Sequence, residues 1–138
     1  AARYASGTAL GEASEVEAHN LIVGTNAANG YSMTVNGTTL TSGGNTITAI
    51  GASNAASSIG TEQFGLRLTA SGGVGAVNAP YSASGFAFDT GAFPDTVATS
   101  TSATANTTYS ARYLANISAN TEAGSYSSTL TYTATANY

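Results

Sequence analysis

The segment 129–138 alternates strictly between hydroxyl-bearing or amide side chains and apolar ones. Threonine fills every second position from Thr129 to Thr135, and the positions between hold Leu130, Tyr132, Ala134, Ala136 and finally Tyr138. An alternation with a period of two places one set of side chains on each face of a β-strand. No segment of the chain has the 3.6-residue apolar period of an amphipathic helix. The pattern therefore restricts the chain to folds that are built from strands.

Shorter segments repeat this alternation and are separated by turn-forming residues. Residues 31–35 alternate in front of Asn36-Gly37, and this dipeptide predicts a type I′ hairpin turn into a strand over 38–41. Loops are expected at 51–61 and 89–107. Further strands are expected at 15–25, 45–50, 64–69, 86–88 and 109–117.

This arrangement predicts an all-β fold. Many short strands joined by turns rich in glycine, asparagine and serine are typical of an antiparallel immunoglobulin-like β-sandwich, here with about seven to nine strands. No fixed-period repeat and no linker divides the chain. We expect a single domain over residues 11–138, preceded by an N-terminal extension over residues 1–10.

The composition excludes several classes of chemistry. Among 138 residues there is no cysteine and no tryptophan, there is one histidine, and the net charge is −4. The chain therefore has no disulfide, thiolate metal site or cysteine nucleophile. Its basic side chains, apart from the histidine, are Arg3, Arg67 and Arg112, which provide neither a lysine for Schiff-base chemistry nor a basic footprint for nucleic acid. We expect a protein that is not an enzyme, uses no cofactor and binds no nucleic acid.

The same composition bears on where the protein works. The longest apolar run is Leu21-Ile22-Val23, so no membrane-spanning helix is expected. A chain that begins with Ala1-Ala2 and is rich in small uncharged residues is typical of a secreted prokaryotic surface protein after removal of its signal peptide. We therefore expect an extracellular or cell-surface location.

Two groups of residues suggest catalysis, but each has a simpler interpretation. The triplet Asp89-Thr90-Gly91 resembles the active-site triplet of retroviral-type aspartic proteases, but the same residues form ordinary turns, which we favour. His19 could act as a base beside Glu15 or Glu17. A lone histidine among alternating glutamates is more typical of a solvated strand face, so we assign no catalytic residue.

Other polar residues could bind calcium or carry sugars. Glu12 with Glu15 and Glu17, or Asp89 with Asp95, could help to hold a structural calcium ion, although neither group has the spacing of a known calcium loop. No metal ligand is therefore assigned. Candidate N-glycosylation sequons begin at Asn36, Asn106 and Asn116.

The threonine row at 129, 131, 133 and 135 suggests a flat face. Binding to ice or another ordered lattice would need several such rows in register. Threonine is also well suited to an outer strand face as a polar residue, and we favour that interpretation.

The C-terminal segment also carries a resemblance. Residues 122–138, with Ala123-Gly124, Tyr126 and an alternating final strand that ends on an aromatic residue, resemble the last strand of spore-coat-U-like subunits and archaic chaperone–usher pilins. WxL-type cell-wall domains are similar at the start of this strand, and residues 25–35 are similar in style to bacterial surface-repeat domains. The resemblance implies a secreted immunoglobulin-like sandwich that is used in surface fibres or coats.

We therefore expect a structural subunit of an extracellular filament, pilus or coat that assembles with copies of itself by β-strand addition. In this hypothesis Ala1 to Leu10 is the donor strand and 125–138 lies in the accepting sheet. The candidate interface residues are Tyr4, Thr8, Leu10, Leu130, Tyr132 and Tyr138. The alternative is a glycan- or wall-binding module of a surface adhesin, with other surface proteins or glycans as its partners.

Overall fold

The computed structural model describes residues 2–6 and 11–138. Within these residues the chain forms twelve strands and no helix, and all pairings between named strands are antiparallel. The predicted all-β, antiparallel character is confirmed. The strands are β1 (Arg3–Tyr4), β2 (His19–Thr25), β3 (Tyr31–Gly37), β4 (Thr41–Ser42), β5 (Asn45–Thr46), β6 (Gly51–Ala55), β7 (Gln63–Ser71), β8 (Ala76–Val77), β9 (Phe86–Phe88), β10 (Asp95–Ser100), β11 (Thr104–Asn116) and β12 (Leu130–Ala136).

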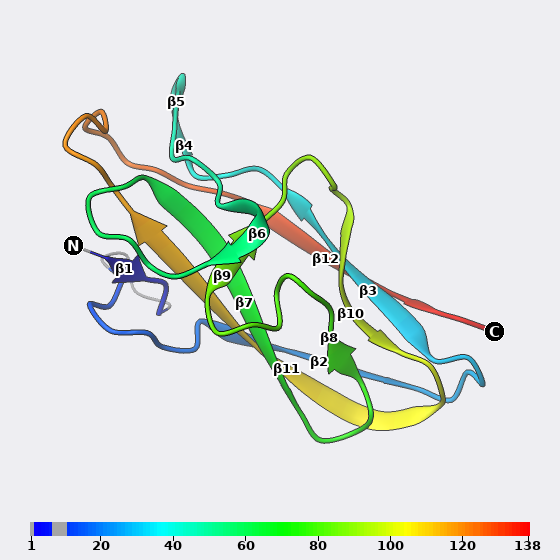
Figure 1. The fold of residues 1–138 in the computed structure, drawn as a ribbon. Coiled ribbons are helices and arrows are strands. Elements are labelled where there is room, and N and C mark those ends of the chain that lie inside the picture. The colour runs from blue at the N-terminus through cyan, green and yellow to red at the C-terminus, as the bar shows by residue number, and fades with distance from the viewer. Residues whose placement is uncertain (1, 7–10) are drawn as a thin grey trace.

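The first sheet is organised around β11, which is 13 residues long. On one side β11 pairs with β7, and β9 and β6 continue the sheet beyond it (Figure 1). On the other side two strands share β11 in succession: β2 pairs with residues 104–111, and β1 pairs with Leu114 and Ala115. The first two strands, β1 and β2, therefore lie along a single edge of β11.

The second sheet has the order β12-β3-β10-β8. β3 and β12 pair without a shift of register from Leu130 opposite Gly37 to Ala136 opposite Tyr31. β10 contains a bulge between Thr96 and Ala98. A separate short pair, β4 and β5, forms a hairpin.

The two sheets pack against each other around one main core, to which their alternating strands contribute inward-facing side chains. Tyr31 of β3 and Tyr109 of β11 are both fully buried, and their hydroxyl groups share a hydrogen bond of 2.6 Å across the core. Burial, followed by this hydrogen bond, raises the pKa of Tyr109. Gly75 packs directly against this pair and leaves room for it, because a Cβ at Gly75 would lie 2.1 Å from the Tyr109 hydroxyl oxygen. Large tyrosines thus fill a core that contains few large aliphatic side chains.

Four local predictions are wrong. Asn36-Gly37 does not turn the chain, because β3 continues through Gly37 and the next hairpin joins β4 to β5. The segment 45–50 is a strand only over β5, and the predicted loops at 51–61 and 89–107 contain β6, β10 and the start of β11. The bulge in β10 turns both Val97 and Ala98 into the core, which breaks the period of two. These strands therefore depend on pairing with strands that are distant in sequence, and not on a local alternation of apolar and polar residues.

Candidate functional site

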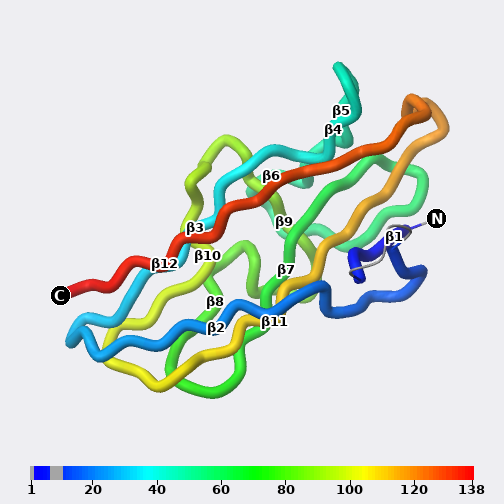
Figure 2. The backbone as a smooth tube through the Cα atoms, turned by 180° about the vertical axis from the view of Figure 1, so that it is seen from behind, coloured from blue at the N-terminus to red at the C-terminus, as the bar shows by residue number. Residues whose placement is uncertain are grey.

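β2 and β12 are the edge strands on one side of the molecule. Among the described residues, β2 pairs only with β11 and β12 pairs only with β3. Both strands run along the side that faces the viewer in Figure 2. On the opposite side, the edge strand β8 has two residues and the edge strand β6 pairs with β9 across a register shift. The two seven-residue strand edges therefore lie on the β2/β12 side, and β12 pairs with its neighbour without a register shift.

The hydrogen bonds of the C-terminal segment show which of its backbone groups are free. Asn137 donates its N–H to the carbonyl of Gly30, and Ser127 donates to the carbonyl of Thr41. Both bonds lie on the β3 side. Because successive N–H groups along a strand point to opposite sides, the even-numbered residues of β12 point their N–H and C=O groups away from β3. A second strand could pair with these residues, which are Leu130, Tyr132, Ala134 and Ala136.

An apolar groove of about 420 Å³ opens between the two sheets beside β12. A smaller hollow of about 260 Å³ shares part of its wall and reaches toward β1. Side chains from both sheets and from the loops at one end line the larger groove: Ala5, His19, Leu40, Phe64, Tyr113, Ser128, Leu130 and Tyr132. A groove of this kind is suited to apolar side chains or to the apolar face of a ring.

On the β2/β12 side, a row of three polar side chains bridges the two sheets. His19 Nε2 lies 2.8 Å from the Tyr113 hydroxyl oxygen, which lies 2.6 Å from the Tyr132 hydroxyl oxygen. The rings of His19 and Tyr132 also meet edge to face, with centroids 5.9 Å apart. Burial raises the pKa of Tyr113 to about 12, and burial together with Tyr113 raises the pKa of Tyr132. Both tyrosines are therefore neutral near pH 7, and the row ties β2, β11 and β12 together.

The structure places the predicted interface residues at three different sites. Leu130 and Tyr132 are half-buried and line the groove, whereas the side chain of Tyr138 is 92% exposed. Tyr4 lies in β1, opposite Leu114 of β11. Thr8 and Leu10 lie outside the described residues.

The described part of the predicted donor strand is bound within its own chain. Arg3 pairs with Ala115, Tyr4 pairs with Leu114, and Ala5 donates its N–H to the carbonyl of Tyr113. Ala2 is buried in a second, smaller apolar cluster, separate from the main core, that also contains Phe86, Leu114, Tyr4 and Ile50. The N-terminal residues thus complete both a strand edge and an apolar cluster of the first sheet.

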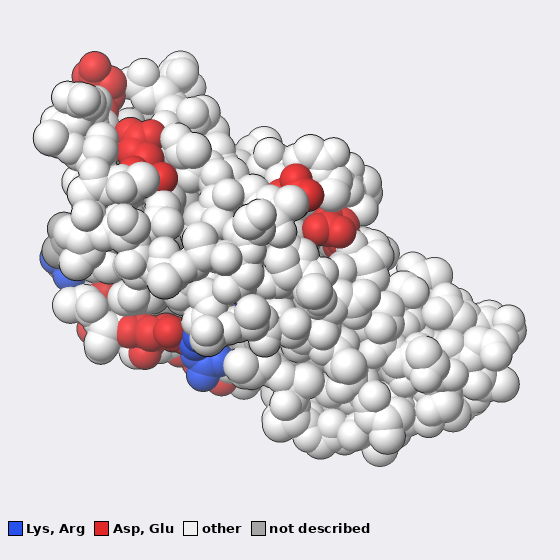
Figure 3. Space-filling view, in the orientation of Figure 1, with Lys and Arg blue, Asp and Glu red and all other residues white. Residues whose placement is uncertain are grey.

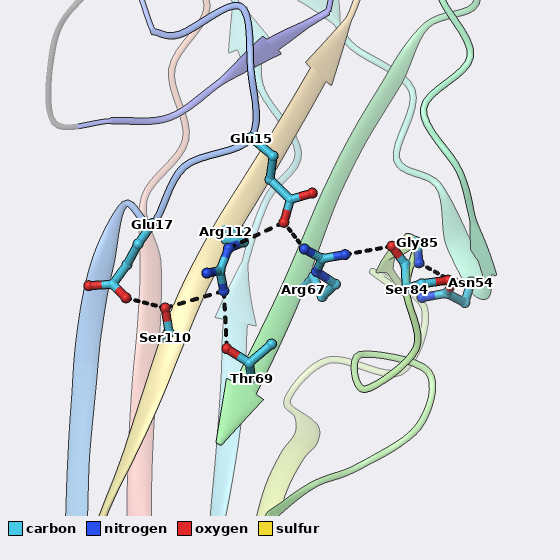
Figure 4. Close-up of polar contacts among 9 residues, drawn as sticks. All are labelled: Glu15, Glu17, Asn54, Arg67, Thr69, Ser84, Gly85, Ser110 and Arg112. Atoms are coloured by element: carbon cyan, nitrogen blue, oxygen red, sulfur yellow. Dashed lines mark hydrogen bonds and ion pairs between the residues drawn. The ribbon is translucent and has the colours of Figure 1, made fainter. Parts of the chain in front are cut away.

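Two arginines hold the segment that follows. Arg67 of β7 and Arg112 of β11 stand directly opposite each other in the sheet. Both form ion pairs with the same carboxylate oxygen of Glu15, and the Arg112 Nε lies 3.2 Å from it (Figure 4). Burial, together with the charge of Arg112, lowers the pKa of Arg67. Glu15 therefore offsets the repulsion between two neighbouring cations, and we call this group of Glu15, Arg67 and Arg112 the arginine clasp.

Further bonds fix the two arginines of the clasp. Arg67 donates to the carbonyl of Ser84 at 2.6 Å, and its guanidinium carbon lies 5.3 Å from the ring centroid of Phe86. Arg112 donates to the hydroxyl groups of Thr69 and Ser110. The sequence shows each arginine between inward-facing neighbours, but only the register of β7 and β11 brings the two together, so sequence reasoning missed the clasp.

Replacing Glu15 by glutamine should lower the free energy of unfolding by about 1 kcal/mol, the upper end of the range for ion pairs near the protein surface. The reason is that Arg67 and Arg112 would then face each other without a counter-charge. Urea unfolding at low and high salt measures the effect, which should shrink as salt screens the repulsion. Glu122→Gln, at an exposed position that forms no ion pair among the described residues, is the control. An equal loss for both variants would contradict the role of the clasp.

Three further carboxylates are bonded individually. Glu17 accepts a hydrogen bond from Ser110, and Asp95 accepts one of 2.7 Å from the Tyr81 hydroxyl group. Asp89 accepts the N–H of Gly91, which is the turn bond expected of Asp-Thr-Gly. No group of three or more potential metal-binding side chains occurs in the part of the chain that the structure describes.

The three sequons differ in exposure. Asn36 and Asn106 are exposed on β3 and β11. The Asn116 side chain is 1% exposed and donates to Gln63 and Ser57. A glycan at Asn116 has no room in the folded domain.

The threonines of β12 are neighbours of further hydroxyl groups on the second sheet. Thr133 lies opposite Thr34, which lies opposite Thr96, and Thr135, Ser32 and Thr99 form a second such row. Charged side chains are also unevenly distributed: on the face shown in Figure 3 they lie away from the end that carries the β2–β3 and β10–β11 turns. The outer face of β12 and β3 carries no charged side chain.

No protein-family model, curated protein or solved structure matches the chain. The resemblance of residues 122–138 to coat and pilus subunits therefore rests on those residues alone. In residues 2–6 and 11–138 there is no helix that is long and apolar enough to cross a membrane.

Proposed function

We propose that the protein is a structural subunit of an extracellular filament, pilus or surface coat, and that its immunoglobulin-like sandwich associates with other copies by β-strand addition. The observation that carries the proposal is the free edge of β12. This strand has seven residues, a continuous register with β3, and no charged residue or proline. Natural proteins usually protect such an edge with charges, prolines, bulges or short length.

A comparison within the molecule strengthens this argument. The edges on the opposite side are protected in the usual ways, because β8 is short and β6 is irregular. The β12 edge has neither protection, so regular and unprotected edges are not a general property of this chain. We infer that β12 is kept regular because it pairs with a strand of another subunit.

The side chains beside this edge support the same interpretation. Ala134 and Ala136 lie on the same face of β12 as Leu130 and Tyr132, which is the face toward the core, yet both alanines are exposed. A strand added along β12 would satisfy the free backbone groups, cover these alanines and place apolar side chains near the groove. Small side chains at this edge let another strand approach closely.

The groove also favours the second candidate function, a glycan- or wall-binding module. Tyr113, Tyr132 and Phe64 offer aromatic surface, and His19 adds a polar group at the rim. Rings of this kind can pack against the apolar face of a sugar. This module would remain monomeric, so self-association separates the two proposals.

An extracellular location is part of the proposal. It is supported by a charged fraction of 7%, by the absence of lysine and by the lack of any cysteine that would need a reducing environment. Few cleavage sites for trypsin-like proteases would be an advantage in such a location.

Ala134→Pro should prevent assembly while leaving the domain folded. Proline removes an N–H that points away from β3, and proline is tolerated on an edge strand when its missing N–H faces solvent. Ala134→Ser keeps this N–H and is the matched control. Negative-stain microscopy and light scattering should show filaments or large assemblies for the wild type and for Ala134→Ser, and monomers for Ala134→Pro. A wild type that stays monomeric at high concentration, or a proline variant that assembles normally, would overturn the proposal.

A further inference from the structure

The N-terminal segment, residues 2–6 and 11–17, binds to a surface of its own domain, which we call the receptor. The receptor offers three kinds of contact: the backbone edge of β11 at residues 113–115, the apolar surface of Phe86 and Leu114, and the paired guanidinium groups of Arg67 and Arg112. The strand β1 of the segment pairs with the β11 edge, and the side chains of Ala2 and Tyr4 pack on the apolar surface. The carboxylate of Glu15 forms ion pairs with the two guanidinium groups. These contacts match in hydrogen bonding, polarity and charge.

Among the described residues, a short strand and partly exposed ion pairs hold this segment. β1 contributes only two residues to the sheet, and Ala2 reaches into a cluster with just three buried members. Beyond Glu15, Ser110 binds Glu17, and the regular pairing of β2 begins at His19. Segments held by short strands and partly exposed ion pairs open at a lower free energy than the core does.

Exchange of such a segment between copies preserves all of its contacts. A neighbour's segment has the same sequence, so binding in trans recovers the strand pairing, the apolar cluster and the clasp. The difference is the tether, which gives the chain's own segment an effective concentration on the order of millimolar. In dilute solution the segment therefore stays on its own β11, whereas subunits that are already packed together reach comparable local concentrations.

We propose that residues 2–6 and 11–17 of one subunit dock on the β11 edge and arginine clasp of a second copy when subunits assemble. The proposal rests on self-assembly as the proposed function, but it names a contact different from the β12 edge. Because each chain donates one segment and accepts another, the exchange can close as a reciprocal dimer or continue head-to-tail, and a filament requires the head-to-tail form. Charge complementarity fixes its register, since Glu15 must meet both Arg67 and Arg112.

Cysteine cross-linking tests this exchange directly, because the chain has no cysteine of its own. Arg3 and Ala115 face each other in register, a geometry within reach of a disulfide. An Arg3→Cys chain is mixed with an Ala115→Cys chain at concentrations that give assemblies, and the mixture is then oxidised. Mass spectrometry should find the peptide that joins position 3 to position 115 between chains. The same mixture in dilute monomeric solution should give at least about tenfold less of this product, because the tether there favours the chain's own segment.

Two controls make the outcome decisive. The double variant Arg3→Cys/Ala115→Cys should form its disulfide within one chain in dilute solution, which checks that the geometry allows the bond. Arg3→Cys mixed with Val74→Cys, at an exposed position in the β7–β8 loop, measures random collisions. Assemblies that give no more 3–115 linkage than this random background would overturn the exchange and leave the β12 proposal standing. If no assembly forms and only the double variant cross-links, both proposals fail.

Discussion

Replacing Gly30 by alanine should destabilise the domain by more than about 4 kcal/mol, an effect reserved for severe structural conflicts. Gly30 lies between β2 and β3 with a φ of 76°, a conformation that costs an alanine about 1–2 kcal/mol. A Cβ there would also lie 2.0 Å from the carbonyl oxygen of Ser100 and 2.9 Å from the N of Ser102. Both atoms belong to the backbone, so relief requires the β10–β11 turn to move. Thermal or urea unfolding followed by circular dichroism measures the loss.

Gly43→Ala is the matched control for this prediction. Gly43 has a similar φ of 59°, but a Cβ at this position would have no neighbouring atom within 4 Å. Its substitution should cost only the conformational part, about 1–2 kcal/mol. Equal losses at the two glycines would show that crowding at Gly30 contributes nothing. The carbonyl of Gly30 also accepts the N–H of Asn137, so the Gly30 variant should loosen the end of β12 as well.

Phe88→Ala should cost about 3–5 kcal/mol, the usual range for removing a buried phenylalanine. The Phe88 side chain is fully buried and meets Phe64 and Phe93 edge to face, with ring centroids 4.7 Å and 5.0 Å away. Domains of this size are stable by only about 5–15 kcal/mol, and here aromatic side chains carry much of the core. Urea unfolding should show a much lower midpoint.

Ile59→Ala is the control for Phe88→Ala. The Ile59 side chain is 71% exposed, so its truncation should change the free energy of unfolding by no more than about 0.5 kcal/mol. A small loss for Phe88→Ala would mean that the surrounding side chains collapse into the space, contrary to the rigid aromatic packing described above.

The fold class could be read from the sequence where a strand buries one face. In β3 and β12 a period of two survives because each strand presents one side to the core and the other to solvent. The hairpin predicted at Asn36-Gly37 failed for the opposite reason: the local turn preference is worth less than the seven-residue pairing of β3 with β12. β10 was missed because its bulge places Val97 and Ala98 on the same side.

The candidate site was only partly predictable. Leu130 and Tyr132 were expected at an interface because they belong to the alternating final strand, and they line the groove beside the free edge. His19 was expected on a solvated face, yet it also contacts Tyr113 and Tyr132 from other strands. Contacts between strands that are distant in sequence depend on sheet order and register, which single-strand patterns do not contain.

The sequence by itself determined that this is an all-β chain without thiol or lysine chemistry and with an uncharged, regular final strand. These properties are local, because they follow from residue types and from a period of two. Only the tertiary structure decided that β12 ends up at an edge, that the N-terminal residues lie on β11, and that Arg67 and Arg112 share Glu15. The physical reason is that strand pairing joins residues far apart in the chain, so the free energy of each pairing depends on the complete arrangement of the two sheets.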